Sequence, residues 1–301
     1  MSTAISRDFV GYGEFPPDFE WPGGARLAVD VVINYEEGAE RNGLDGDTTR
    51  EHLVEARYDV PDGERELFTE STFEYGSRVG IWRLLRVLDA HGVVPTVFAS
   101  ALALERNPAV TAALLERDCD FVGHGYRWIP HTGMTREQER DNIQACVRSL
   151  EKLTGRRVQG WFTRPPNTVH TRSLLKECGL VYDSGAVNDD LPYYEDVDGE
   201  PFLVIPYSLD VNDTKFYKQQ FFTGEDFARY TLDCFSFLLT ESRWRPRMMS
   251  IGLHPRIIGR PARMAGLQRV LDQIAHRSDV WLAGRDRIAD YWRAHHPPTS
   301  G

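Results

Sequence analysis

The chain has 301 residues, of which 41% are hydrophobic and 27% charged, and its formal net charge is −10 at pH 7. This composition is typical of a globular protein with a large core, and the negative charge argues against nucleic acid or an anionic membrane surface as the main partner. Residues 1–8 lack the apolar core of a signal peptide and no apolar run approaches the length of a membrane span, so we expect a cytoplasmic protein without a membrane partner.

Segments typical of strands alternate with segments typical of helices along the chain. The expected strands are 26–33, 93–99, 120–123, 158–163, 180–182, 202–206, 248–253 and 280–283. The expected helices are 77–91, 108–117, 134–153, 171–178, 225–241, 262–276 and 286–295. This succession, with no linker or repeat, predicts a single α/β domain over residues 1–301, built as a barrel or an open parallel sheet, and it favours the barrel-like form.

Two segments lie outside this alternation. We expect residues 1–24 to form an N-terminal arm and residues 38–76 to form a long, polar inserted segment. A loop of this length in a compact domain is usually a lid over a functional site, a subunit contact, or both.

Polar side chains follow the expected strands at their C-terminal ends. In a parallel barrel these ends converge on one face, where α/β enzymes present their catalytic residues. The sequence therefore predicts an active site at this face. Its candidate residues are Asn34, Tyr35, Glu36, Glu37, His124, Tyr126, Trp128, Arg164, Asn212, His254 and Arg260.

Individual candidates carry different weight. His254 ends an apolar run and precedes a Pro/Gly-broken loop with three arginines, although a lone histidine is more often a satisfied core residue. Arg164 stands before two prolines, which favours an extended conformation suited to binding a carboxylate or a carbonyl oxygen. Glu36 and Glu37 are adjacent, so we expect only one of them to face the site. The aromatic candidates either wall a pocket or pack in the core.

Motifs along nearly the whole chain resemble the NodB-type polysaccharide deacetylases. The matching stretches are 11–13, 34–38, 74–78, 124–128, 182–184, 188–193, 206–213 and 252–263. The likeness is closer to the cytoplasmic branch of small cyclic amide hydrolases, which comprises metal-independent allantoinases and cyclic imide hydrolases. The resemblance implies an irregular (β/α) barrel, hydrolysis of a carbon–nitrogen bond, and assembly into a homodimer or homotetramer.

The departures from the family pattern bear on the cofactor and the substrate. Metal-dependent deacetylases hold a divalent ion with an aspartate after the first strand and two histidines four residues apart after the third. Here Asn34 stands at the aspartate position and Trp128 four residues beyond His124, whereas zinc usually needs three protein ligands. We therefore expect no cofactor, with a divalent metal such as zinc, held with help from His131, as the alternative. Residues 160–167 resemble the deacetylase arginine–proline motif, which leaves the identity of the ring open.

These observations lead to a hypothesis for the chemistry on a small cyclic substrate. Glu36 or Glu37 activates water, Arg164 with a backbone N–H holds the oxyanion, and His254 protonates the leaving nitrogen. His124 positions the water or the substrate. The remaining candidates, which would hold the ring, are Asn34, Tyr35, Tyr126, Trp128, Asn212 and Arg260. The alternatives are a metal-dependent N-deacetylase of an amino sugar or peptidoglycan fragment and an inactive ligand-binding barrel.

Overall fold

The structure, a computed structural model, describes residues 7–52, 60–61 and 64–298. The first residues of the expected arm and two stretches of the expected inserted segment, 53–59 and 62–63, lie outside the described residues. Within the described part, no helix is long and apolar enough to cross a membrane.

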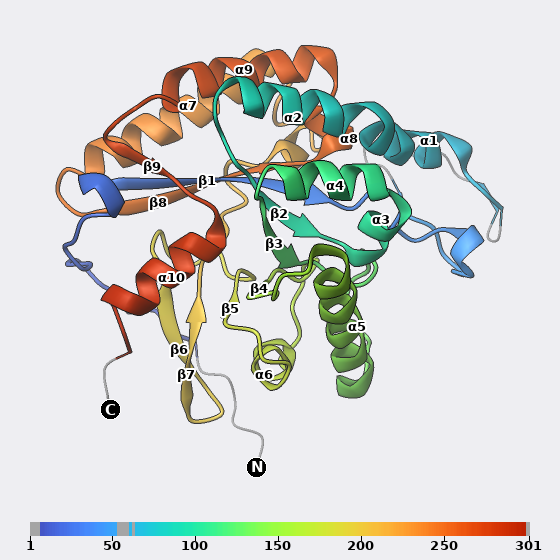
Figure 1. Cartoon of the computed structure of the whole chain (residues 1–301), viewed down its shortest axis with the longest axis horizontal. Helices are drawn as coiled ribbons and strands as arrows, with labels where there is room; N and C mark the ends of the chain where they lie inside the picture. Colours follow the sequence, from blue (N-terminus) through green and yellow to red (C-terminus); the bar gives the residue numbers. More distant parts are fainter. Residues whose placement is uncertain (1–6, 53–59, 62–63, 299–301) are drawn as a thin grey trace.

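A curled, largely parallel sheet forms the centre of the molecule (Figure 1). Its strands are β1 Leu27–Tyr35, β2 Thr96–Ala99, β3 Asp120–Gly123, β4 Gly160–Trp161, β5 Tyr182–Asp183, β6 Tyr193–Val197, β7 Glu200–Val204, β8 Arg247–Leu253 and β9 Val280–Leu282. The strand order is β6-β7-β5-β4-β3-β2-β1-β8, with β9 on β1, and the β6–β7 pair is antiparallel. The predicted α/β class with an irregular barrel is confirmed.

The sheet curls without closing: among the described strands, β6 and β8 end the strand order and do not pair with each other. Single backbone hydrogen bonds bridge the opening. Met248 N–H donates to the Asp190 carbonyl (3.0 Å), and Gly252 N–H donates to the Val211 carbonyl (2.9 Å). The loops after β5 and β7 thereby approach β8, and the strand ends meet on one face.

Helices cover the sheet. They are α1 Leu67–Tyr75, α2 Ile81–Ala90, α3 Ala101–Arg106, α4 Pro108–Glu116, α5 Arg136–Thr154, α6 Thr171–Glu177, α7 Gly224–Glu241, α8 Pro255–Ile258, α9 Pro261–Ile274 and α10 Arg285–His295. In Figure 1, α2, α7 and α9 lie along one side of β1 and β8. Residues typical of helix ends flank α5: Thr135 and Gln138 form a capping box at its start, and Gly155 ends it with φ of 67°.

Three local expectations were wrong. The polar segment before residue 77 contains α1, which a π-helical turn over Gly76–Gly80 joins to α2. Residues 193–204 form the β6–β7 hairpin, although only its second strand was expected. Residues 255–258 form α8 instead of a loop. Local apolar periodicity is weak in each of these short segments, so tertiary contacts decide their structure.

The core explains why β1 lies at the centre. All nine residues of β1 are buried, as expected for a strand that pairs with β2, β8 and β9 and has both faces covered. One of its residues, Asp30, forms a buried ion pair with Arg285 (3.1 Å). Arg285 also donates to Ser250 Oγ (2.7 Å) and the Ile205 carbonyl (3.0 Å), so it joins β8 to the end of β7. This strand-end arginine therefore ties the sheet together below the candidate site.

Candidate active site

Glu36 lies at the centre of a buried cluster of ionisable side chains. Its Oε1 is 3.1 Å from Nε2 of His124 and 3.5 Å from Nε2 of His254, and its Oε2 is 2.6 Å from Nη2 of Arg256. The four residues come from the ends of β1, β3 and β8 and from α8, and each is at most 5% exposed. The parallel sheet thus brings together three of the candidates named from strand ends.

A carboxylate orients His254. Asp213 Oδ1 is 2.6 Å from Nδ1 of His254, and Asp213 Oδ2 accepts hydrogen bonds from the backbone N–H groups of His254 (2.7 Å) and Ile258 (3.2 Å). Burial disfavours the charged imidazole, but Asp213 and Glu36 outweigh it and raise the pKa of His254 to about 9. His254 is therefore an imidazolium at neutral pH, with Nε2 as the proton donor nearest Glu36.

The two adjacent glutamates have different environments. Burial opposes ionisation of Glu36, but Arg256 and His254 outweigh it and hold its pKa well below the usual range. Burial raises the pKa of Glu37, whose oxygens accept from the backbone N–H groups of Glu36 (3.1 Å) and Arg256 (3.1 Å). Glu37 thus joins the loop after β1 to α8, and Glu36 faces both histidines.

His124 is held in one orientation. Its Nδ1 is 2.6 Å from the Phe162 carbonyl, which only accepts, so Nδ1 carries a proton. The ring also stacks on the Phe162 side chain, with centroids 5.1 Å apart. Nε2 is left facing Glu36, 3.1 Å from its Oε1.

Arg256, Asp213 and Phe73 complete the cluster, and none of them was among the sequence candidates. The guanidinium of Arg256 lies 4.6 Å from the centroid of the Phe73 ring, which α1 contributes, and 5.1 Å from that of Trp128. The arginine-rich stretch after His254 is the signal that could have singled out Arg256. Phe73 is 2% exposed, whereas Phe68 at the start of the same helix is 50% exposed.

Arg164 does not join the cluster. Its guanidinium donates to both oxygens of Glu51 (2.7 and 2.9 Å) and to the Trp128 carbonyl (2.9 Å), and it stacks on the Trp128 ring at 3.6 Å. Arg164 therefore makes its contact with the inserted segment. The structure does not bring this arginine to Glu36, because Glu51 already neutralises it.

Three further candidates point to other partners. The Tyr126 hydroxyl donates to Glu105 (3.0 Å) in an exposed contact, so this side chain does not wall the cluster. The Tyr35 hydroxyl is 2.9 Å from Ser77 Oγ, and the Arg260 guanidinium lies over the Tyr75 ring at 3.6 Å. These three side chains connect helices and loops around the site.

Asn34 and Asn212 lie in a buried layer beside the cluster. Both side-chain amides donate to the Tyr207 hydroxyl, at 3.1 and 3.2 Å. Asn212 also accepts from the backbone N–H of Thr214 (2.9 Å) at the start of the 3-10 turn Asp213–Phe216. Asn212 thus positions the turn that carries Asp213, the partner of His254.

The residues present do not fit the divalent metal site that the family resemblance raises. Among the described residues, no group of three or more histidine, cysteine, aspartate or glutamate side chains is arranged to hold an ion. His131 Nδ1 pairs with Glu139 Oε1 (3.2 Å), and Trp128 has no ligand atom. Arg256 also places a permanent positive charge 2.6 Å from the Glu36 carboxylate, which disfavours a cation there.

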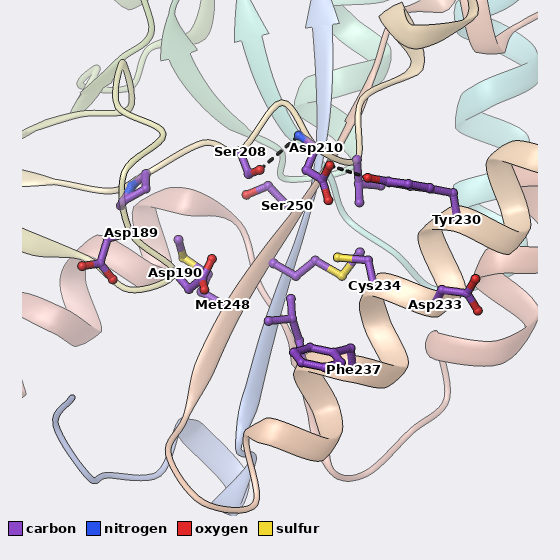
Figure 2. A pocket seen from close by; sticks show the side chains of 14 residues that line it. Asp189, Asp190, Ser208, Asp210, Tyr230, Asp233, Cys234, Phe237, Met248 and Ser250 are labelled. Atoms are coloured by element: carbon purple, nitrogen blue, oxygen red, sulfur yellow. Dashed lines mark hydrogen bonds between the residues drawn. The ribbon is translucent and has the colours of Figure 1, made fainter. Parts of the chain in front are cut away.

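A separate cavity of about 440 Å³ lies between β8, α7 and the segment 206–211 (Figure 2). Four aspartates surround it, and Met248, Cys234 and Phe237 line its apolar part; Asp210 accepts from the Tyr230 hydroxyl (2.5 Å). None of the clustered ionisable residues lines this cavity. The cavity is therefore distinct from the candidate active site.

Gly76, the first residue of the π-helical turn, packs closely against Glu37 and the backbone of Arg256. A Cβ at this position would lie 2.8 Å from the backbone nitrogen of Arg256 and even closer to the Glu37 side chain. We therefore expect Gly76→Ala to destabilise the fold by about 1–3 kcal/mol through overpacking and to lower kcat by displacing α8.

Urea denaturation and steady-state kinetics check this expectation. Gly43→Ala is the matched control, because a Cβ there meets no atom within 4 Å. Equal midpoints of unfolding for the two variants would contradict the expected clash.

Comparisons with known proteins agree with the observed fold. Residues 65–182 match the model of the polysaccharide deacetylase family. A putative polysaccharide deacetylase of Schizosaccharomyces pombe is 37% identical over 97% of this chain and 98% of its own length. A peptidoglycan deacetylase of Helicobacter pylori is 22% identical over 74% of this chain and 87% of its own length.

Two solved structures superpose on almost the whole chain. One is a probable polysaccharide deacetylase from Pseudomonas aeruginosa PAO1, with a TM-score of 0.92 and 44% identity over 97% of this chain and 99% of that chain. The other is PuuE allantoinase, with the same TM-score, identity and coverage. The chain therefore belongs to the polysaccharide deacetylase family and has its NodB-type fold.

Proposed function

We propose that this protein hydrolyses a carbon–nitrogen bond in a small cyclic imide, amide or ureide. The observation that carries the proposal is the position of Glu36, an ionised carboxylate 3.1 Å from His124 and 3.5 Å from the imidazolium of His254. A base and an acid side by side are the groups that amide hydrolysis needs. The 44% identity to a protein named PuuE allantoinase supports a cyclic ureide or a related ring as the substrate.

Glu36 is the base in this proposal. A water bound at the Glu36 carboxylate loses its proton to that carboxylate as the water oxygen bonds to the substrate's carbonyl carbon. The low pKa of Glu36 keeps it ionised at neutral pH but makes it a weak base. This favours substrates that are already activated, such as cyclic imides, in which the leaving nitrogen delocalises its charge into a second carbonyl.

His254 is the acid. As the tetrahedral intermediate collapses, the carbon–nitrogen bond breaks and the nitrogen takes the proton from Nε2 of His254. Asp213 keeps the ring oriented through Nδ1. Glu36 lies 3.5 Å from Nε2, so the proton taken from water can return to His254 and restore both groups.

N-deacetylation of an amino sugar is the second candidate, because relatives are named as polysaccharide and peptidoglycan deacetylases. The cation beside Glu36 and the tryptophan after His124 count against the metal-dependent form of that reaction. An inactive binding barrel is the third candidate. A site that binds without turnover has no use for an oriented acid next to a base, which argues against it.

A hydrolysis screen tests the proposal. The panel contains allantoin, hydantoin, succinimide, maleimide, glutarimide, phthalimide and an N-acetylglucosamine oligomer, each assayed after extensive dialysis against chelator and again with added zinc. We expect turnover of at least one ring, with nearly unchanged kcat after chelation. Stoichiometric zinc by elemental analysis, with activity lost on its removal, would contradict the mechanism, and turnover of the sugar alone would contradict the substrate class.

A further inference from the structure

Arg256 has hydrogen-bonding capacity that the folded chain does not use. The residue is 3% exposed, and its Nη2 lies 2.6 Å from Glu36 Oε2. Among the described residues, Nε and Nη1 have no hydrogen-bond partner, and Nη1 is 3.5 Å from Glu37 Oε1, which is too long for a good hydrogen bond. Buried donors without a partner are costly, so natural proteins keep them mainly where a function uses them.

The guanidinium is also fixed in place. The rings of Phe73 and Trp128 pack against it, and the backbone N–H of Arg256 is bonded to Glu37. Burial opposes its charge, but Glu36 and Glu37 outweigh this and hold the pKa of Arg256 above its usual range. The group is therefore a permanent, oriented cation that needs no rearrangement when charge develops beside it.

The weak base Glu36 requires a group that polarises the substrate's carbonyl. Glu36 is a weak base because its pKa is low, so attack by water depends on strong polarisation of the carbonyl under attack. His254 is committed to the leaving nitrogen and to Asp213. Arg164, which the sequence favoured for this role, has its donors on Glu51 and the Trp128 carbonyl.

We infer that Arg256 is a catalytic residue that binds the substrate's carbonyl oxygen through its open N–H groups and stabilises the oxyanion. The inference rests on the proposed function in that Glu36 delivers water to the same carbonyl. As the water oxygen bonds to carbon, the π-electron pair moves onto the carbonyl oxygen, and the guanidinium donates hydrogen bonds to it without giving up a proton. The electron pair returns when the carbon–nitrogen bond breaks.

The rival explanation is that Arg256 only balances the charge of Glu36. Arg256→Lys separates the two, because lysine keeps a positive charge beside Glu36 but loses the planar set of donors. We expect kcat to fall by about 10²-fold with a small change in KM, the scale for loss of an oxyanion donor. Arg164→Lys, which also alters a stacked arginine, is the matched control and should change kcat by less than about 10-fold.

Chemical rescue sharpens the test. Arg256→Ala should regain part of its kcat when guanidinium chloride is added at millimolar concentration, below the range that denatures proteins, whereas sodium chloride should have no effect. Urea denaturation of each variant checks that it is folded. An unchanged kcat in Arg256→Lys, or a loss equal to that in Arg164→Lys, would overturn the inference.

A binding measurement keeps the inference testable apart from turnover. Succinamate, the ring-opened form of succinimide, carries a carboxylate that the open donors should bind; calorimetry should show at least about tenfold weaker binding to Arg256→Lys than to the wild-type protein. Equal affinity would overturn the role of Arg256. If the screen finds only sugar deacetylation, the proposed substrate class fails, and the same variants test Arg256 on that amide.

Discussion

Replacing His254 with alanine is expected to lower kcat by about 10³-fold, within the usual range for loss of a general acid. The expectation follows from the geometry: Asp213 orients the ring through Nδ1, and Nε2 faces the base at 3.5 Å. Without the imidazolium the departing nitrogen must leave unprotonated. The loss should therefore shrink along a series of substrates whose leaving nitrogens are progressively more acidic.

The pH dependence gives an independent check. The pKa of His254 is raised from 6.5 to about 9, so the acid is protonated at neutral pH, and the activity that depends on it should fall as the pH rises through about 9. The same shift stabilises the fold. That contribution is fully present below about pH 6.5, the pKa of His254 in the unfolded chain, and is lost as the pH rises through its pKa in the folded protein, about 9.

Controls separate catalysis from folding. His254→Ala leaves the buried Asp213 without its partner, so a lower stability than wild type is expected, and His254→Gln supplies a second variant that fills the site. His91→Ala is the matched control, since His91 is also largely buried and paired with an aspartate, Asp272, but lies outside the cluster. An equal loss of kcat along the leaving-group series would make His254 a binding or structural residue.

The sequence indicated the strand ends better than the partners of the residues found there. The boundaries of β3, residues 120–123, were predicted, and Glu36, His124 and His254 follow β1, β3 and β8 as expected, because a buried parallel strand is a long apolar run that ends where polarity returns. Which of Glu36 and Glu37 faces the histidines depends on loop geometry that no periodicity encodes.

Arg164 and Arg256 show most clearly what the sequence could not predict. Arg164 follows the expected strand 158–163 and Arg256 follows the expected strand 248–253, and the two prolines after Arg164 favoured it as the site arginine. Long-range pairing decided otherwise: Glu51 of the inserted segment neutralises Arg164, while α8, a four-residue helix with little sequence signal, carries Arg256 to Glu36. Such choices depend on contacts between residues distant in sequence, which a local pattern does not contain.

The predicted assembly into a dimer or tetramer stays a prediction.

Replacing Glu36 with glutamine should also lower kcat by about 10³-fold, because the amide cannot take a proton from water. The change is nearly isosteric, so the positions of His124 and His254 should change little. It also removes the counter-charge of the buried Arg256, which typically costs about 3–5 kcal/mol of folding free energy. Urea denaturation identifies conditions in which the variant is folded. Steady-state kinetics under those conditions measure the loss of kcat separately from the loss of stability.

Stability at acid pH reports on the same carboxylate. Because the folded pKa of Glu36 lies below its ordinary value of 4.5, ionised Glu36 stabilises the fold above that value, and the contribution is lost as the pH falls through the folded pKa. The wild-type protein should therefore lose stability more steeply than Glu36→Gln below about pH 4.5. Parallel denaturation curves for the two proteins across this range would contradict the charge assigned to Glu36.

Glu37→Gln is the control that decides between the adjacent glutamates. Glu37 accepts hydrogen bonds from the backbone N–H groups of Glu36 and Arg256, and an amide oxygen can still accept at least one of them. We expect kcat of Glu37→Gln to change by less than about 10-fold, since the group holds the loop and does not face the histidines. An equal loss in the two variants would contradict the assignment of Glu36 as the sole base. A large loss in Glu37→Gln with a small one in Glu36→Gln would reverse the roles of the two residues.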